Sequence, residues 1–400
     1  MNSLVRGCLW AALALGSGAA FSQDPVVTWG EALEAGWRRA LERAEGARQL
    51  QRAEAERTAA ESRWAAPPAV ELSHRSGRSP GDGGSVRETE AGLAWPLWLP
   101  GQRQSRLGAA EAAIEAARLG LEAARLRLAG ELRQGALAVA GQVAELRQAE
   151  VETRLLKALA EDVERRLRAG DLARADLMAA EAELLQAQAS QQAAAQRLQA
   201  ARDRWQLLTG LEALPPAGAD AGAAGAATHP ELAAAVARVE SARRRLQAAE
   251  TFRRDPPEVG VSVRRETDNS GSATSLGVSL RVPFGGDRLN APALAQARGE
   301  LEVALLEEQR TRERLALEAR SAELQVRSAG QQLEAERSRA ALLRQRAELI
   351  ERSFRAGETA LPELLRALGG AAQADAAVLR QQAALAQAQA RLSQSLGVLP

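Results

Sequence analysis

The chain has 400 residues, and its 52 Lys and Arg residues nearly balance 51 Asp and Glu residues, so the formal net charge is only +1. This balance leaves no basic stripe for a nucleic-acid partner, and the alternating Arg and Glu residues indicate solvated helix faces. Aromatic residues make up 3% of the chain and Tyr is absent, whereas hydrophobic residues, mostly Ala and Leu, reach 46%. That composition is typical of long helices and coiled coils.

Residues 1–22 predict a secretory signal peptide. Arg6 supplies a positive charge, an apolar stretch runs from Cys8 to Leu15, and Ala20-Phe21-Ser22 fits the small-x-small cleavage pattern. We place the cleavage after Ser22, with Ala20 as the alternative. Cys8 is the only cysteine of the sequence and lies in the signal peptide, so cleavage of that peptide excludes disulfide and thiol chemistry from the mature chain. An exported chain without a run of about 20 apolar residues is either soluble or crosses an outer membrane as a β-barrel.

The mature chain opens with a predicted helix from Thr28 to about Trp64. Thr28 and Glu31 have the spacing of a capping box, and Pro67-Pro68 ends the helix. Two segments of alternating apolar and polar residues follow, separated by turn formers from Gly77 to Gly84. A β-hairpin is therefore predicted over about 68–97.

A long helix is predicted from Gln102 to Arg168, with a length of about 100 Å at 1.5 Å per residue. After a turn at Gly170, a second helix from Leu172 to Gln206 carries two heptad rows. The second row is mostly alanine, which lets the helices of a coiled coil approach closely. The rows are Leu177, Leu184, Gln191, Leu198 and Trp205, and then Ala180, Ala187, Ala194, Ala201 and Leu208.

Residues 212–229 have the composition of a linker, and the pattern then repeats. The second copy is predicted as a helix from His229 to about Arg253, a hairpin over about 257–284, a helix from about Pro292 to Phe354, a turn at Gly357 and a helix from Leu361 to Leu396. Arg168-Ala169-Gly170-Asp171 and Arg355-Ala356-Gly357-Glu358 are 187 positions apart (355 − 168), and Pro96 and Pro283 keep the same offset. The sequence thus predicts a mainly α protein with a small β part, built as two repeats over 23–211 and 230–400.

Each repeat supplies two strands of about nine residues, long enough for a tilted bilayer crossing. Four strands cannot close a membrane barrel, and open strand edges are costly in hydrocarbon, so a barrel needs strands from other copies. Trp95, Trp98 and Phe284 fall at strand ends, where an interfacial aromatic belt is expected. A soluble hairpin that caps a coiled coil is the alternative. The strand residues expected to face the membrane are Val70, Leu72, Leu93, Trp95, Val259, Val261, Val263, Leu276, Val278, Leu280 and Val282.

Several short phrases, in order and at a constant offset, resemble the TolC-like outer membrane efflux protein family over nearly the whole mature chain. They are Trp29-Gly30-Glu31-Ala32-Leu33, His229-Pro230-Glu231-Leu232, Val282-Pro283-Phe284 and the two Arg-Ala-Gly-Asp/Glu turns. The resemblance implies a homotrimer with a twelve-stranded β-barrel in outer-membrane lipid and a helical tunnel through the periplasm. It also implies a periplasmic adaptor and an inner-membrane transporter as partners. The duct would pass drugs, metal ions or other small molecules, or secreted proteins, without chemistry or a cofactor.

The same resemblance places the two turns at the periplasmic tip of the tunnel. Asp176 and Glu363 match an acidic pore position in the two repeats, while Arg366 and Ala179 stand where the family often has a further acid. Alternatively, both acids are favourable charges in a first helical turn. Pro362 stiffens the second copy, so we expect the gate at the first turn and a more rigid docking surface at the second. The residues expected to contact the adaptor are Arg168, Gly170, Asp171, Arg355, Gly357 and Glu358.

No enzyme is predicted. His74 and His229 are far apart in the sequence, and neither a Gly-rich phosphate loop nor a Ser/His/acid arrangement is present. Metal binding by His74 is an open alternative to a surface role. The main competing hypothesis is an exported periplasmic coiled-coil adaptor or scaffold without a membrane barrel, and an exported hydrolase has no supporting site.

Overall fold

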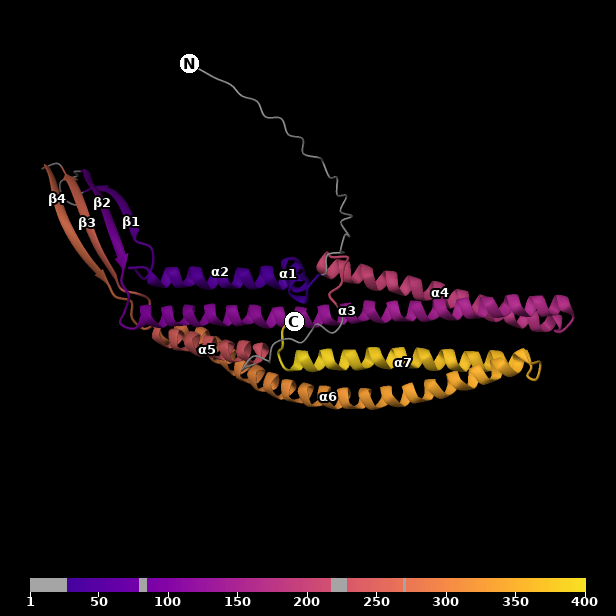
Figure 1. Ribbon diagram of the computed structural model, residues 1–400. Helices are drawn as coiled ribbons and strands as arrows, with labels where there is room; N and C mark the ends of the chain where they lie inside the picture. Colours follow the sequence, from indigo (N-terminus) through magenta and orange to yellow (C-terminus); the bar gives the residue numbers. More distant parts are fainter. Residues whose placement is uncertain (1–26, 79–84, 217–228, 269–270) are drawn as a thin grey trace, which may run out of the picture.

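The structure, a computed structural model, describes residues 27–78, 85–216, 229–268 and 271–400. The predicted signal peptide lies outside these residues. The molecule is elongated, with a small sheet at one end, long helices along its length and two helix turns at the other end (Figure 1). The helices are α1 (Trp29–Arg39), α2 (Leu41–Glu61), α3 (Gln102–Ala169), α4 (Arg174–Thr209), α5 (Pro230–Thr251), α6 (Asp287–Arg355) and α7 (Leu361–Ser395). The strands are β1 (Ala69–Arg78), β2 (Ser85–Pro96), β3 (Glu258–Asp268) and β4 (Gly271–Arg281).

The predicted capping box at the first helix is confirmed. The Glu31 N–H donates to the Thr28 hydroxyl at 3.2 Å, and the Thr28 N–H donates to the Glu31 carboxylate at 2.8 Å. The bond from the Thr28 backbone lowers the pKa of Glu31. The single helix expected up to Trp64, however, is broken at Ala40, whose ψ of 132° is extended. Ala32 and Leu33 of α1 are buried against α3 and α4, so tertiary packing imposes a break, and residues 37–45 around it contain no Gly or Pro.

Alanine seams hold the long helices together. α3 is 68 residues long, and α4 folds back along it after the turn. Ala180, Ala187 and Ala194 are buried, as the second heptad row predicted, and Leu198 and Trp205 continue the core toward α1. The Trp205 indole N–H donates to the Ala213 carbonyl at 3.1 Å, so packed chain continues past α4 into the segment with linker composition. Residues 217–228 of that segment lie outside the described part.

The last long helix begins earlier than its proline suggested. α6 starts at Asp287 rather than near Pro292, and Pro292 lies inside the helix. Pro292 is the sixth residue of α6, beyond the four positions whose N–H groups lack a partner, so it costs the helix one backbone bond near its start. Within the described part of the chain, no helix is long and apolar enough to cross a membrane.

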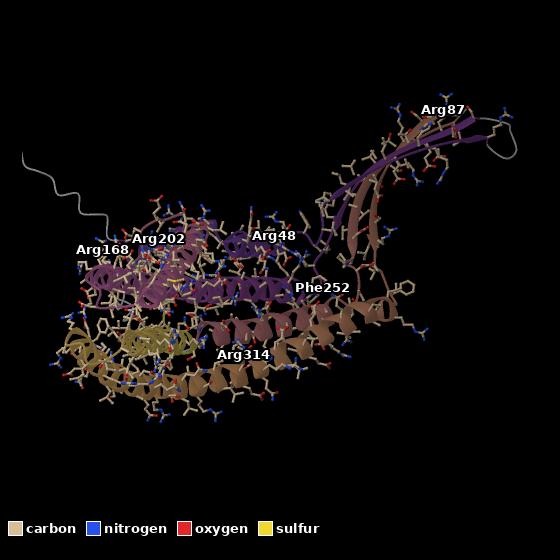
Figure 2. All side chains as sticks on the ribbon, turned by 90° about the vertical axis from the view of Figure 1, so that its right-hand side faces the viewer. Arg48, Arg87, Arg168, Arg202, Phe252 and Arg314 are labelled. Carbon is tan, nitrogen blue, oxygen red and sulfur yellow. The ribbon has the colours of Figure 1, made fainter. Side chains whose placement is uncertain are left out.

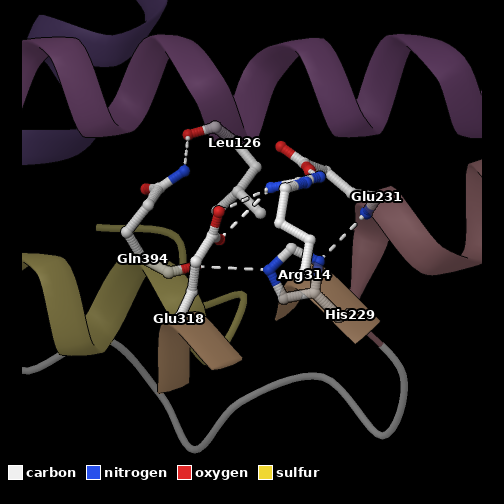
Figure 3. Close-up of polar contacts among 6 residues, drawn as sticks. All are labelled: Leu126, His229, Glu231, Arg314, Glu318 and Gln394. Carbon is white, nitrogen blue, oxygen red and sulfur yellow. Dashed lines mark hydrogen bonds and ion pairs between the residues drawn. The ribbon is translucent and has the colours of Figure 1, made fainter. Parts of the chain in front are cut away.

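A polar cluster joins the two repeats near the middle of the molecule (Figure 3). His229 Nδ1 accepts from the Glu231 N–H at 3.2 Å, so Nε2 is the nitrogen that donates to the Gln394 carbonyl at 3.3 Å. The Gln394 side chain donates in turn to the Leu126 carbonyl of α3 at 3.0 Å. Arg314 of α6 is ion-paired with Glu231, and this bond raises the pKa of Arg314. His229 therefore has a structural role at the start of α5.

The four strands form one antiparallel sheet in the order β1-β2-β3-β4, so the hairpins of the two repeats pair through β2 and β3. Gly77 and Arg78 belong to β1 rather than to the predicted loop. The turn positions 79–84 and 269–270 lie outside the described residues. In the described chain β1 and β4 are the edge strands of this sheet.

Candidate functional site: the twin turns and the two faces of the sheet

The twin turns have the same backbone geometry. Gly170 and Gly357 have φ values of 87° and 80°, in the left-handed region that favours glycine. The Gly170 N–H donates to the Leu167 carbonyl at 3.0 Å and the Asp171 N–H to the Arg166 carbonyl at 2.9 Å. At the positions 187 residues further on, Gly357 and Glu358 donate to Phe354 and Ser353 at 3.0 and 2.9 Å. The duplication thus extends to individual hydrogen bonds.

The side chains of the two turns differ. Arg168 is exposed and paired with Glu164 at 2.6 Å, and Arg355 is paired with Glu351. Asp171 and Glu358 are both exposed, but the Glu358 carboxylate accepts from the Ser353 hydroxyl at 3.3 Å, whereas no side-chain hydrogen bond of Asp171 is found among the described residues. The second turn is therefore closed on itself by a side-chain contact.

The two turns pack together through a contact that the sequence analysis missed. The Arg166 guanidinium lies over the ring of Phe354 at 4.8 Å from the centroid and donates to the Phe354 carbonyl at 3.3 Å. Phe354 is 3% exposed and shares a core with Val163 and Leu361. At offset 187 the counterparts of Arg166 and Phe354 are Ser353 and Leu167. This difference between the two repeats is the sequence signal that could have indicated the contact.

Asp176 and Glu363 occupy equivalent places at the starts of α4 and α7. The Asp176 carboxylate accepts from the Ala173 N–H at 3.1 Å, which satisfies an amide at the helix start. Glu363 is exposed, and its backbone N–H donates to the Ala360 carbonyl at 3.1 Å. The helix-start role is visible for Asp176, and the gate role of both acids stays a prediction.

A second acidic group lies further along the helices from the turns and was also missed. Glu152 of α3, Glu183 of α4 and Asp375 of α7 line a pocket between the two helical hairpins, together with Arg344 of α6. Arg344 is paired with Asp375 at 3.1 Å. Burial and then the charge of Glu183 raise the pKa of Glu152. In the described chain, no group of three or more His, Cys, Asp or Glu side chains is placed to hold a metal ion.

The sheet register puts the strand residues expected to face a membrane on one side, which we call the apolar face. Val70 is opposite Leu93, Leu93 is opposite Val261, and Val261 is opposite Val278. The neighbouring rows contain Leu72, Ala91, Val263 and Leu276, and then Trp95, Val259 and Leu280. Val282 lies just after β4. Val70, Leu72 and Val278 are 77%, 75% and 77% exposed, so no described part of the chain covers these three side chains.

The three aromatic residues at strand ends have different surroundings. Phe284 is 92% exposed, whereas Trp95 is partly buried, 6.3 Å from Trp64. The Trp98 indole N–H donates to the Ser62 carbonyl at 3.0 Å, and its ring meets Phe252 edge-on where sheet and helices join. Figure 2 labels Phe252 at this junction. Trp98 therefore fixes the junction, and Phe284 is free to contact an interface.

The opposite side of the sheet, the polar face, combines small residues with paired charges. Arg264 contacts Glu88 at 2.8 Å and Glu90 at 3.3 Å, and so links the hairpins of the two repeats. Arg75 is paired with Glu88 at 3.6 Å. One face is thus suited to hydrocarbon and the other to water.

No protein-family model matches the sequence, and no curated protein sequence matches it. Solved structures of outer membrane channels do match the fold. The outer membrane protein VceC from Vibrio cholerae covers 92% of this chain and 96% of its own at 14% identity, with a TM-score of 0.72. The Campylobacter jejuni CmeC outer membrane channel covers 99% and 94% at 13% identity, with a TM-score of 0.74.

The outer-membrane channel OprN is a third match, with 19% identity, coverage of 92% and 90%, and a TM-score of 0.72. At these identities the likeness concerns the fold. The chain has the fold of these outer membrane channels. This confirms the predicted mainly α architecture with four strands per chain. It also confirms the resemblance to TolC-like proteins at the level of the fold.

Proposed function

We propose that three copies of the chain form an outer-membrane exit duct that passively conducts small molecules, such as drugs or metal ions, out of the cell. The observation that carries this proposal is the exposed apolar face on a sheet with two open edges. A hydrocarbon environment would cover that face, and strands of other copies would pair with the edges. The fold shared with outer membrane channels supports the same reading.

The strand order supports closure by a ring of identical chains. β1 and β4 lie at opposite edges of an antiparallel sheet with an even number of strands, so they run in opposite directions. β4 of one copy would therefore pair antiparallel with β1 of the next, as a closed cyclic assembly requires. Three copies give the twelve strands that the family resemblance implies, with the polar face toward the lumen.

The helices also offer surfaces for other copies. Leu185 of α4 is 66% exposed, and Leu317 and Leu342 of α6 are 62% and 67% exposed. In a ring of copies these side chains would be covered by neighbouring helices, which would surround a tunnel. The twin turns then form the end opposite the sheet, where a periplasmic adaptor and an inner-membrane transporter would deliver the substrate.

Membrane fractionation and single-channel recording test the proposal. The chain should fractionate with the outer membrane, resist salt washing and purify as a detergent-dependent trimer that forms channels in planar bilayers. Release by salt as a detergent-free monomer would instead support the periplasmic scaffold.

A further inference from the structure

The strands segregate their charges by face. All six acidic residues of the strands lie on the polar face, as the register shows. They are Glu71, Glu88, Glu90, Glu258, Glu266 and Asp268. Three arginines, Arg78, Arg87 and Arg265, lie instead on the apolar face, among Ser, Thr and His residues. If these charges served solubility alone, acids would be expected on both faces.

The arginines of the two faces also differ in their partners. On the polar face Arg75, Arg264 and Arg281 each pair with a glutamate. Among the described residues, no ion pair involves Arg78, Arg87 or Arg265, and all three side chains are exposed. Arg87 pairs in register with Thr267, and Arg265 pairs with Thr89, so the two arginines are diagonal neighbours on adjacent strands. Two unpaired like charges this close favour an anionic partner.

The arginines lie at the edge of the apolar band. The last apolar row contains Leu72, Ala91, Val263 and Leu276. Arg265 is two residues beyond Val263, about 7 Å along the strand. Arg87 lies one row beyond Arg265 on the same face, still further from the apolar band. Figure 2 shows Arg87 toward the end of the sheet that is remote from the helices, with Arg168 at the opposite end of the molecule. In a bilayer that covers the apolar band, these guanidinium groups reach the headgroup layer.

We propose that Arg87 and Arg265, with Arg78 beside them, bind the phosphate groups of lipid headgroups in the outer leaflet. This inference rests on the proposed outer-membrane location. Arginine presents a planar fork of donors that matches phosphate oxygens, and the surrounding Ser and Thr hydroxyls add donors. In a trimer the surface recurs three times around the outside of the barrel. Lipid phosphates there would fix the depth and tilt of the duct.

Lipid binding to the purified trimer in neutral detergent tests this surface. Native mass spectrometry would compare lipid A that carries its phosphates, the same lipid after dephosphorylation, and inorganic phosphate. We expect Arg87 and Arg265 together to give the wild type about a 30-fold preference for phosphorylated lipid, since each of these arginines near an anionic headgroup contributes roughly a factor of five. Inorganic phosphate should not compete at millimolar concentration, because the apolar band binds the acyl chains.

The matched variants are Arg87→Gln with Arg265→Gln, and Arg75→Gln with Arg281→Gln. Both pairs remove two positive charges from exposed strand side chains, but the second pair changes the polar face. The first variant should lose the preference for phosphorylated lipid, and the second should keep it. An equal preference in both variants, no preference in the wild type, or displacement by inorganic phosphate would overturn the inference. A wild type that forms no detergent-dependent trimer would instead refute the proposed function itself.

Discussion

Substitution of the turn glycines tests how the two helix reversals are maintained. In Gly170→Val and Gly357→Val a β-branched residue must adopt φ values of 87° and 80°. A Cβ atom at either position would meet nothing within 4 Å outside its own turn, so a Cβ clash with the rest of the described chain adds nothing to the cost. The cost is therefore the backbone strain of a left-handed L-residue, about 1–2 kcal/mol at each turn.

That strain is released when the last helical bonds of the turn open. The amides of Asp171 and Glu358 donate across the turns at 2.9 Å, so each reports on opening of its own turn. Hydrogen exchange of these amides should accelerate about 5- to 30-fold, the factor that 1–2 kcal/mol represents. Crosslinking to the adaptor should fall in parallel, because a frayed turn no longer presents a fixed surface.

Gly369→Val is the matched control, since Gly369 lies within α7, has no positive φ and also has open space around its Cβ position. It should leave the exchange of both turn amides unchanged. Gly170→Asn should have a smaller effect than Gly170→Val, because asparagine tolerates the left-handed region. If Gly170→Val and Gly369→Val gave the same exchange rates, strain at the turn would not be what the glycine avoids.

Three further predictions concern side chains near the turns. Phe354→Ala should destabilise the protein by about 3–5 kcal/mol in chemical unfolding, because it empties a buried site. Phe354→Leu introduces the residue of the first repeat and should cost less. Equal losses of stability in the two variants would argue against a packing role of Phe354. If Asp176 lines the gate, Asp176→Ala should change single-channel conductance or cation block in planar bilayers. If Asp176 only accepts from the Ala173 amide, the variant should lose about 1 kcal/mol of stability and leave conductance and cation block unchanged. Glu152→Gln should stabilise the protein at about pH 7, because burial and the charge of Glu183 disfavour the ionised carboxylate in the folded state and so raise the pKa of Glu152. The difference should vanish below about pH 4, where Glu152 is protonated in the folded and the unfolded state. Unfolding midpoints at both pH values check this last prediction, with exposed Glu161→Gln as the control, and a Glu152→Gln effect that does not change with pH would contradict it.

The sequence by itself determined the features that depend on local pattern. Heptad rows predicted the seam at Ala180, Ala187 and Ala194, and the repeated phrases predicted the turns at Gly170 and Gly357. The period-2 alternation predicted which strand residues share the apolar face. Each of these signals is written in neighbouring residues, because helix and strand periods fix side-chain direction along the chain.

Only the tertiary structure decided the features that depend on contacts between distant segments. The break at Ala40 follows from packing of α1 against α3 and α4, since residues 37–45 contain no Gly or Pro. The contact of Arg166 with Phe354 joins two repeats whose relative placement no heptad row specifies. The pairing of β2 with β3 fixed the register that puts Arg87 beside Arg265, away from every strand acid, because a shift of one residue would have moved those charges to the other face.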